Sequence, residues 1–236
     1  MKAPSSADGD SSAAAPAPST ARKILLVDDH PITRQGLRML ISQQPGMSVV
    51  GESDNAAQAM DLAAKLKPDI VIVDIALRSA NGIELTKNLK AHSPDLLILI
   101  VSMHDEELFA ERALRAGARG YLMKHEASER VVEALGKIST GELYISDRVR
   151  GRMLSRLVNN RTGEVTSPVE SLSDREMEVF QLIGNGYATR QIAERLNLSV
   201  KTIDSYREHL KLKLSLESGA ELVRYAIQWV KAQDSV

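Results

Sequence analysis

Short apolar segments alternate with segments of helical periodicity from residue 23 to about residue 140, and this alternation constrains the fold more than any other feature. The apolar segments are rich in Val, Ile and Leu without regular polar residues between them, as expected of strands buried on both faces. These segments are 23–28, 48–53, 69–74, 96–102 and 119–124, and the helical patterns lie near 32–43, 56–67, 82–91, 105–116 and 127–139. Five strands that alternate with five helices predict an α/β domain with a parallel sheet.

Polar residues stand at the carboxyl ends of the predicted strands. They are Asp28, Asp29, Asp74, Ser102 and Lys124. The active groups of such a sheet lie at the carboxyl ends of its strands, so we expect these side chains to lie together. Clustered carboxylates repel one another unless a cation lies among them, and oxygen ligands select Mg²⁺ or Ca²⁺. Mg²⁺ often combines one or two carboxylates with a phosphate oxygen, and a lysine and a hydroxyl suit a phosphoryl group beside it.

The rest of the chain divides by composition. Residues 1–21 hold Ala, Ser, Pro, Gly and Asp with almost no large apolar residue, which predicts a disordered tail. Asn-Asn, Thr-Gly and Ser-Pro pairs within 148–170 predict a linker, with a possible short helix at 147–158. From residue 171 the pattern is wholly helical. Net charge is −4 over 23–147 and +3 over 148–170, a mild indication that an anion meets the second half of the chain.

Length and composition exclude several classes of protein. The chain of 236 residues is too long for one small domain and suits two. No apolar run approaches the roughly 18 residues of a membrane helix, and the N-terminus lacks the apolar core of a signal peptide, so we expect a cytoplasmic protein without a membrane partner. The lack of cysteine excludes disulfides, thiolate metal sites and cysteine nucleophiles.

Residues 23–139 resemble the receiver domain of a two-component response regulator, and the whole chain resembles the NarL/FixJ type. The matching segments are DDHPITRQGL at 28–37, DIVIVDIAL at 69–77, NGIEL at 81–85, LILIVSMHDE at 97–106 and GARGYLMK at 117–124. The spacings also fit, with 45 residues from Asp29 to Asp74, 28 from Asp74 to Ser102 and 22 from Ser102 to Lys124. The resemblance implies a five-stranded, parallel, doubly wound (flavodoxin-like) receiver domain followed by an all-α helix-turn-helix domain.

The resemblance also implies a phosphorylation site and a metal site. Asp74 would accept a phosphoryl group from a sensor histidine kinase. Asp28 and Asp29 would hold Mg²⁺ together with Asp74 and the backbone carbonyl of Ala76. The product would be an aspartyl phosphate, a mixed anhydride that water can later hydrolyse.

The remaining receiver positions would bind and sense the phosphoryl group. By the resemblance, Ser102 would be the switch hydroxyl and Lys124 would contact the phosphoryl group, and Tyr121 stands where the family has its switch aromatic. We expect Tyr121 to turn into the space that Ser102 leaves when its loop moves inward. Two residues depart from the family pattern: Arg78 replaces the usual proline of a Met-Pro pair, and Ala76 offers no side-chain hydrogen bond to a hydrolytic water.

Residues 171–232 resemble the LuxR-type helix-turn-helix domain. The matching stretch is LSDREMEVFQLIGNGYATRQIAERLNLSVKTIDSYREHLKLKL. Ser173 and Glu176 have the spacing of a capping box at the start of the first helix. Ser199 is expected to cap a recognition helix near 200–214. Periodicity predicts a buried stripe on that helix, made of Ile203, Tyr206, Leu210 and Leu214.

The other faces of the recognition helix are candidates for DNA contact. The candidate DNA-binding residues are Lys201, Thr202, Ser205, Arg207, Lys211 and Lys213. Basic side chains of this kind contact phosphates, which orient the domain without reading sequence. Asp204 and Glu208 lie on the same side and either accept a hydrogen bond from cytosine or pair with Lys201 and Lys211. We therefore expect modest affinity per monomer and a homodimer as the active form.

These observations predict a transcription regulator that is controlled by phosphorylation. We expect it not to be an enzyme, although the receiver promotes its own phosphoryl transfer and hydrolysis. We expect a tail at 1–21, a receiver at 22–140, a linker at 141–170 and the DNA-binding domain at 171–236. Two alternatives stay open. One is a Mg²⁺-dependent phosphatase-like enzyme with an aspartyl phosphate, although no second acid follows Asp74 closely. The other is a receiver that is regulated without phosphorylation.

Overall fold

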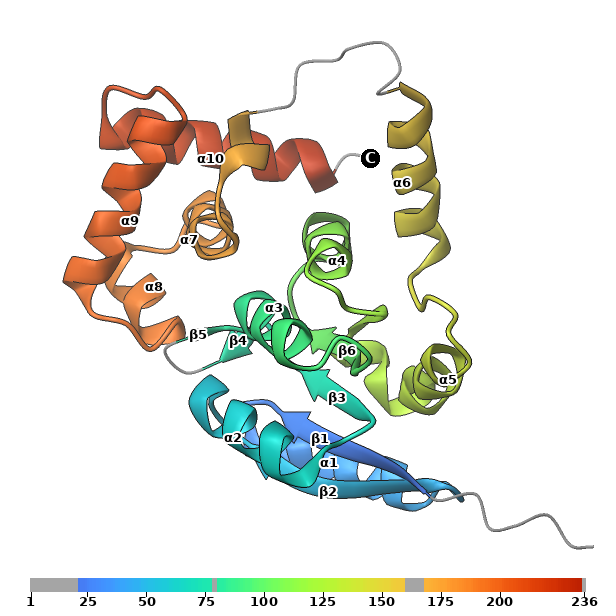
Figure 1. Cartoon of the computed structure of the whole chain (residues 1–236). Helices are drawn as coiled ribbons and strands as arrows, with labels where there is room; N and C mark the ends of the chain where they lie inside the picture. The colour runs from blue at the N-terminus through green and yellow to red at the C-terminus, as the bar shows by residue number, and fades with distance from the viewer. Residues whose placement is uncertain (1–20, 78–79, 160–167, 235–236) are drawn as a thin grey trace, which may run out of the picture.

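A five-stranded parallel sheet forms the centre of the N-terminal half of the protein (Figure 1). The structure is a computed structural model that describes residues 21–77, 80–159 and 168–234. The strands stand in the order β2-β1-β3-β6-β7, and every neighbouring pair is parallel. They are β1 Arg22–Val27, β2 Met47–Ser53, β3 Ile70–Val73, β6 Leu97–Ser102 and β7 Gly120–Met123. This is the predicted flavodoxin-like fold, and the strand order reverses between β1 and β3.

Helices cover both faces of this sheet, because consecutive residues of its strands point to opposite sides. Ile24 and Leu26 pack in the cluster that holds the buried residues of α1 and α5, whereas Leu25 and Val27 pack in the cluster that holds those of α2, α3 and α4. The helices are α1 Pro31–Ser42, α2 Ala56–Leu66, α3 Gly82–His92, α4 Glu106–Arg115 and α5 Ala127–Ser139. Each lies within one or two residues of its predicted range.

Short polar residues start three of these helices close to the sheet edge. The side chains of Asn55, Asn81 and Asp105 accept hydrogen bonds from backbone N–H groups in the first turns of α2, α3 and α4. Such caps satisfy N–H groups that have no partner within the helix. Gly82 lets the start of α3 approach β3 closely, since a Cβ atom there would lie 2.0 Å from the backbone oxygen of Asp74.

A small antiparallel pair interrupts the predicted loop after β3. β4 Ala76–Leu77 pairs with β5 Ala80–Asn81, and the two residues between them, including Arg78, lie outside the described part of the chain. The predicted disordered tail also lies outside it, except for Ala21. Two residues per strand are too few to leave a periodic signal in the sequence.

Helices alone make up the described C-terminal part of the chain. They are η3 Pro168–Ser171, α7 Asp174–Gly184, α8 Thr189–Arg195, α9 Val200–Lys213 and α10 Gly219–Asp234. The capping box of Ser173 and Glu176 is present at the start of α7, as predicted. The predicted stripe of α9 packs inward, with Ile203 and Leu210 fully buried. None of the described helices is long and apolar enough to cross a membrane.

A helix also occupies Asp147–Asn159, where the sequence indicates a short helix. This helix, α6, lies beside α4, and Arg148 and Arg152 both contact the carboxylate of Glu107 in α4. The predicted boundaries between tail, receiver, linker and DNA-binding domain stay predictions.

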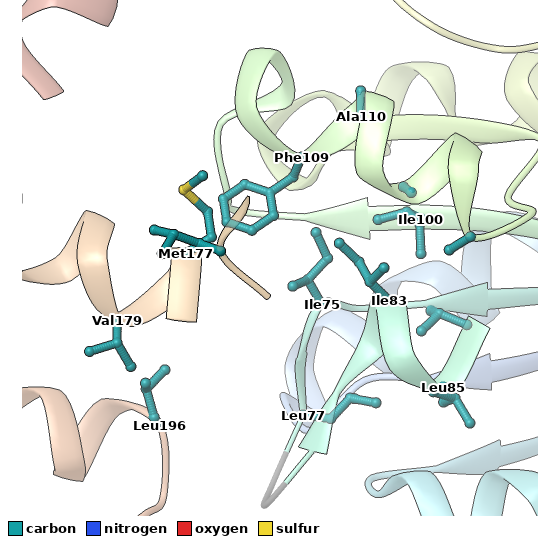
Figure 2. Close-up of a cluster of buried hydrophobic side chains, with 14 of the residues drawn as sticks. Ile75, Leu77, Ile83, Leu85, Ile100, Phe109, Ala110, Met177, Val179 and Leu196 are labelled. Atoms are coloured by element: carbon teal, nitrogen blue, oxygen red, sulfur yellow. The ribbon is translucent and has the colours of Figure 1, made fainter. Parts of the chain in front are cut away.

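Packing continues from the sheet domain into the C-terminal helices. One buried apolar cluster contains Phe109 of α4, Ile75 at the end of β3 and Met177 of α7. Figure 2 shows Met177 reaching toward the Phe109 ring from the side of α7. The two halves therefore meet at α7.

Candidate functional site: an acidic pocket at the strand ends

The sheet register brings two of the predicted acids and the lysine together. Val27 and Val73 are paired, and the Asp74 N–H donates a hydrogen bond of 2.8 Å to the Val27 oxygen, so Asp28 and Asp74 leave adjacent strands side by side. Lys124 follows β7 and reaches back to both. Its Nζ lies 2.6 Å from Asp74 Oδ2 and 2.8 Å from Asp28 Oδ2, with side chains only 7%, 2% and 4% exposed respectively.

Burial controls the ionisation of this group. Burial raises the pKa of Asp74 from 3.8 to about 6, and the charge of Asp28 adds to the rise while Lys124 opposes it. Burial lowers the pKa of Lys124, but the carboxylates of Asp74 and Asp28 outweigh that effect and hold it above its usual value. At neutral pH the buried Asp74 is therefore mostly ionised and lies against a lysine cation.

The pocket suits a hard cation. Asp28, Asp29, His30 and Asp74 each offer a ligand atom, and these atoms all lie within 4.8 Å of one another. Asp74 Oδ1 is buried and has no hydrogen-bond partner among the described residues. An oxygen of this kind is costly to bury without a positive partner, and carboxylate oxygens are ligands of choice for Mg²⁺. Ala76 lies two residues beyond Asp74 in β4, and its role as a carbonyl ligand stays a prediction.

His30 belongs to this pocket as well. Its ring is 61% exposed, yet Nδ1 lies 2.7 Å from Asp29 Oδ1 and 3.2 Å from Asp28 Oδ1. The sequence signal that could have placed His30 in the pocket is its position directly after the acid pair and before the proline that starts α1. His125, which directly follows Lys124, is exposed.

Ser102 and Tyr121 both connect to the loop after β6. Ser102 is fully buried, and its Oγ accepts a hydrogen bond of 3.2 Å from the His104 N–H. Tyr121 is also buried, and its hydroxyl donates a hydrogen bond of 2.7 Å to the His104 carbonyl oxygen. Burial raises the pKa of Tyr121 well above its usual range. The ring is already buried in this structure, and a movement of Tyr121 on phosphorylation stays a prediction.

The predicted DNA-contact residues do not share one environment. Lys201 and Ser205 are exposed on α9, and Arg207 is half-buried. Thr202 interacts with the capping residue Ser199, with 2.7 Å between the two hydroxyl oxygens. These side chains lie along one helix, but their local partners differ.

Two of the predicted basic residues are already paired. Lys211 Nζ lies 2.8 Å from Glu208, which is the pairing expected from helical spacing. Lys213 reaches away from α9 to Glu176 of the capping box, at 2.6 Å. Within the described residues no ion pair joins Asp204 to Lys201. Lys213 is therefore better placed to hold α9 against α7 than to contact phosphate.

Sequence reasoning missed the polar contacts between the two halves of the protein. Asp174 and Glu178 lie four residues apart on α7 and are buried against the sheet domain. Their partners there include Lys87, Arg112 and His104. Helical spacing puts the two acids on one face of α7, but nothing in the sequence indicates that this face is covered.

Known proteins resemble both halves of the chain. The family described as response regulator receiver domain matches residues 24–136, and the family described as bacterial regulatory proteins, luxR family, matches residues 170–226. The oxygen regulatory protein NreC of Staphylococcus epidermidis is 34% identical over 211 residues, which cover 87% of this chain and 97% of that protein.

Solved structures agree with these matches. The RcsB response regulator of Salmonella typhimurium has a TM-score of 0.61 at 26% identity, over 89% of this chain and 98% of that chain. A LuxR family two-component response regulator from Aurantimonas sp. SI85-9A1 has a TM-score of 0.55 at 37% identity, over 58% of this chain and 99% of that chain. An RcsB–DNA complex has a TM-score of 0.54 at 27% identity, over 87% and 97%. The chain therefore belongs to the two-component response regulators of the NarL/FixJ type, in which a receiver domain is joined to a LuxR-type helix-turn-helix DNA-binding domain.

Proposed function

We propose that Asp74 accepts a phosphoryl group from the phosphohistidine of a sensor histidine kinase, and that this event controls DNA binding by the C-terminal helices. The observation that carries the proposal is the state of the Asp74 carboxylate. Its Oδ2 is held by Lys124 at 2.6 Å, whereas its buried Oδ1 lacks a hydrogen-bond partner among the described residues. One oxygen is therefore oriented by Lys124, and the other has no hydrogen-bond partner among the described residues.

Phosphoryl transfer to Asp74 requires the protein mainly to orient the reacting groups and to stabilise charge. An ionised Asp74 oxygen attacks the phosphorus in line, the bond between phosphorus and the donor nitrogen breaks, and an aspartyl phosphate forms. With a pKa of about 6, Asp74 is mostly ionised at pH 7. Lys124 offers a fixed positive charge to the transferring oxygens. Mg²⁺, when held by Asp28, Asp29, Asp74 and the carbonyl of Ala76, supplies further charge neutralisation there.

The phosphorylated state then differs from the free state by local charge. A phosphoryl group adds negative charge and acceptor oxygens beside Asp74. The Ser102 hydroxyl is a donor for such an oxygen, and any shift of Ser102 also shifts His104, because the two are hydrogen-bonded. Such a change would favour one of two arrangements of the loop that carries His104.

DNA binding by α9 is the proposed output. Lys201, Ser205 and Arg207 are the contacts we favour, with Thr202 and Lys211 in supporting positions. Lys213 is left out of this set, because it reaches Glu176 of α7. Structures of RcsB dimers bound to DNA support a homodimer as the DNA-binding form here. We place the protein in the cytoplasm, where kinase and DNA are both accessible.

Incubation with Mg²⁺ and acetyl phosphate tests the proposal. Intact-protein mass spectrometry is expected to show one added phosphoryl group on the wild type and none on Asp74→Ala, and only the wild type is expected to bind DNA more tightly afterwards. The same stoichiometry on Asp74→Ala would show that the site is wrong. If the wild type gained no phosphoryl group, a receiver regulated without phosphorylation would replace this proposal. Release of inorganic phosphate from many small phosphate esters would favour the phosphatase-like alternative.

A further inference from the structure

Helix α7 of the DNA-binding domain is fastened to the receiver by two buried acids. The first is Asp174, whose carboxylate lies 2.9 Å from Lys87 Nζ of α3 and 3.1 Å from Arg112 Nη1 of α4. The same Arg112 nitrogen donates a hydrogen bond of 2.8 Å to the Leu172 carbonyl oxygen. These contacts attach the start of α7 to the outer surface of the receiver, away from the pocket.

The second acid, Glu178, lies deeper in the interface. Its side chain is fully buried, and Arg175 of the same helix donates a hydrogen bond of 2.6 Å to Oε2. From the receiver, Asn81 Nδ2 lies 3.4 Å from Oε2 and His104 Nε2 lies 3.2 Å from Oε1. Burial raises the pKa of Glu178, but His104 and Arg175 outweigh it and lower the pKa below its usual value, so the buried group is ionised.

Both receiver partners of Glu178 lie in segments near the pocket: Asn81 ends β5, and His104 lies in the loop after β6. Asn81 caps α3 by accepting a hydrogen bond of 2.8 Å from the Ile83 N–H, directly beside the close approach of Gly82 to the Asp74 backbone. His104 is bound through its N–H to Ser102 and through its carbonyl oxygen to Tyr121. One carboxylate of the DNA-binding domain therefore contacts the loops on two sides of the pocket.

This docking does not cover the outward face of α9. Lys201, Asp204 and Ser205 are exposed in the same structure, and Figure 1 shows α7 between α9 and the receiver helix α4. The interface therefore leaves these three side chains uncovered. Its contacts act on the receiver loops instead.

We propose that Glu178 is a positioning residue for phosphorylation of Asp74, which through His104 and Asn81 holds the pocket loops in their unphosphorylated arrangement. This inference rests on the proposed phosphorylation of Asp74. Docking of α7 slows the modification, because Ser102 has to draw His104 away from a buried negative charge.

The test is the phosphorylation rate of the full-length protein with Mg²⁺ and acetyl phosphate, followed by intact-protein mass spectrometry. Glu178→Gln keeps the shape of the side chain and removes its charge, and it is expected to raise the rate about fivefold, the lower end of typical coupling between sites. Glu194→Gln is the matched control. It makes the same change on α8, where Glu194 is exposed and pairs only with Arg190 among the described residues, and no rate change is expected.

Two further variants separate positioning from damage to the fold. His104→Gln alters the receiver side of the contact and is expected to give a similar increase. The double variant Glu178→Gln/His104→Gln is expected to be no faster than either single variant, since both remove one interaction. Additive increases, or an unchanged or slower rate in folded Glu178→Gln, would overturn the inference. If Glu178→Gln melts at a much lower temperature than wild type, the inference is judged from His104→Gln alone. An unchanged phosphorylation rate in His104→Gln would then overturn the inference.

Failure of the proposed function is a separate result. If the wild type takes up no phosphoryl group at all, phosphorylation of Asp74 is refuted. If the wild type is modified at Asp74 but all variants match its rate, only the role of Glu178 is refuted.

Discussion

The strand-end pocket of the receiver and the outward face of α9 use the same residue types in opposite environments. In the pocket, the side chains of Asp28, Asp74 and Lys124 are buried, and Lys124 contacts both acids. On α9, Lys201 and Asp204 are exposed and are not paired with one another. Buried charges depend strongly on their partners, whereas exposed charges contribute little each and add up. Substitutions in the pocket are therefore expected to act strongly and jointly, and those on α9 weakly and separately.

The largest effect is expected for Lys124→Met, which removes the lysine cation that contacts both Asp28 and Asp74. Loss of a fixed charge at the transferring oxygens is expected to slow phosphorylation by acetyl phosphate at least about a hundredfold. Lys137→Met is the matched control, because Lys137 pairs with Glu133 on the exposed side of α5. Equal rates for the two variants would show that the pocket lysine takes no part in the transfer.

A smaller effect is expected for Asp74→Asn, measured in EDTA so that no metal ion is bound: its free energy of unfolding is expected to exceed that of the wild type at neutral pH. Folding raises the pKa of Asp74, so the folded state binds the proton more tightly and ionisation of Asp74 costs stability as pH rises from about 4 to about 6. Above that window the cost is complete, at roughly 2 to 3 kcal/mol for a shift of about two units. Urea unfolding is expected to find Asp74→Asn more stable than wild type at pH 7.5 and nearly equal at pH 4. A gain of the same size at both pH values would refute this explanation.

Gly82→Ala probes the backbone beneath the pocket. Its Cβ atom would lie 2.0 Å from the Asp74 oxygen, so β3 or α3 has to move, and overpacking of this kind costs about 1 to 3 kcal/mol. Gly136→Ala in α5 is the control, because a Cβ atom there meets nothing within 4 Å and alanine favours the helix. Urea unfolding is expected to show loss of stability for the first and a slight gain for the second.

The smallest effects are expected on α9. Lys201→Ala is expected to lower the slope of log affinity against log salt for a mixed-sequence DNA duplex by about one, because one phosphate contact is lost. Lys211→Ala is expected to lower it less, since Glu208 already pairs with Lys211. Lys213→Ala is expected to reduce the melting temperature instead, through its contact with Glu176. An unaltered slope for both Lys201→Ala and Lys211→Ala would argue against phosphate contact.

The same contrast explains what the sequence could predict. The strand and helix pattern and the buried stripe of α9 follow from periodicity, which records burial along one element. The meeting of Asp28, Asp74 and Lys124 follows from topology, because parallel strands bring their carboxyl ends to one edge.

Contacts between distant elements left no such signal. Asn81 and Glu178 are 97 residues apart, and their approach depends on how α7 packs against the receiver. The position of the Tyr121 ring likewise depends on the loop that carries His104. A helix face that carries acids is usually solvated, so the burial of Asp174 and Glu178 required the packed structure.

Chemical trapping of the modified residue tests the central claim most directly. Borohydride reduces an aspartyl phosphate to homoserine, which peptide mass spectrometry then locates in the chain. After phosphorylation of the wild type in Mg²⁺, homoserine is predicted at position 74 and not at positions 28 or 29, whose acids serve as metal ligands in this account. Homoserine at position 28 or 29, or at no position in a protein that has gained a phosphoryl group, would contradict it.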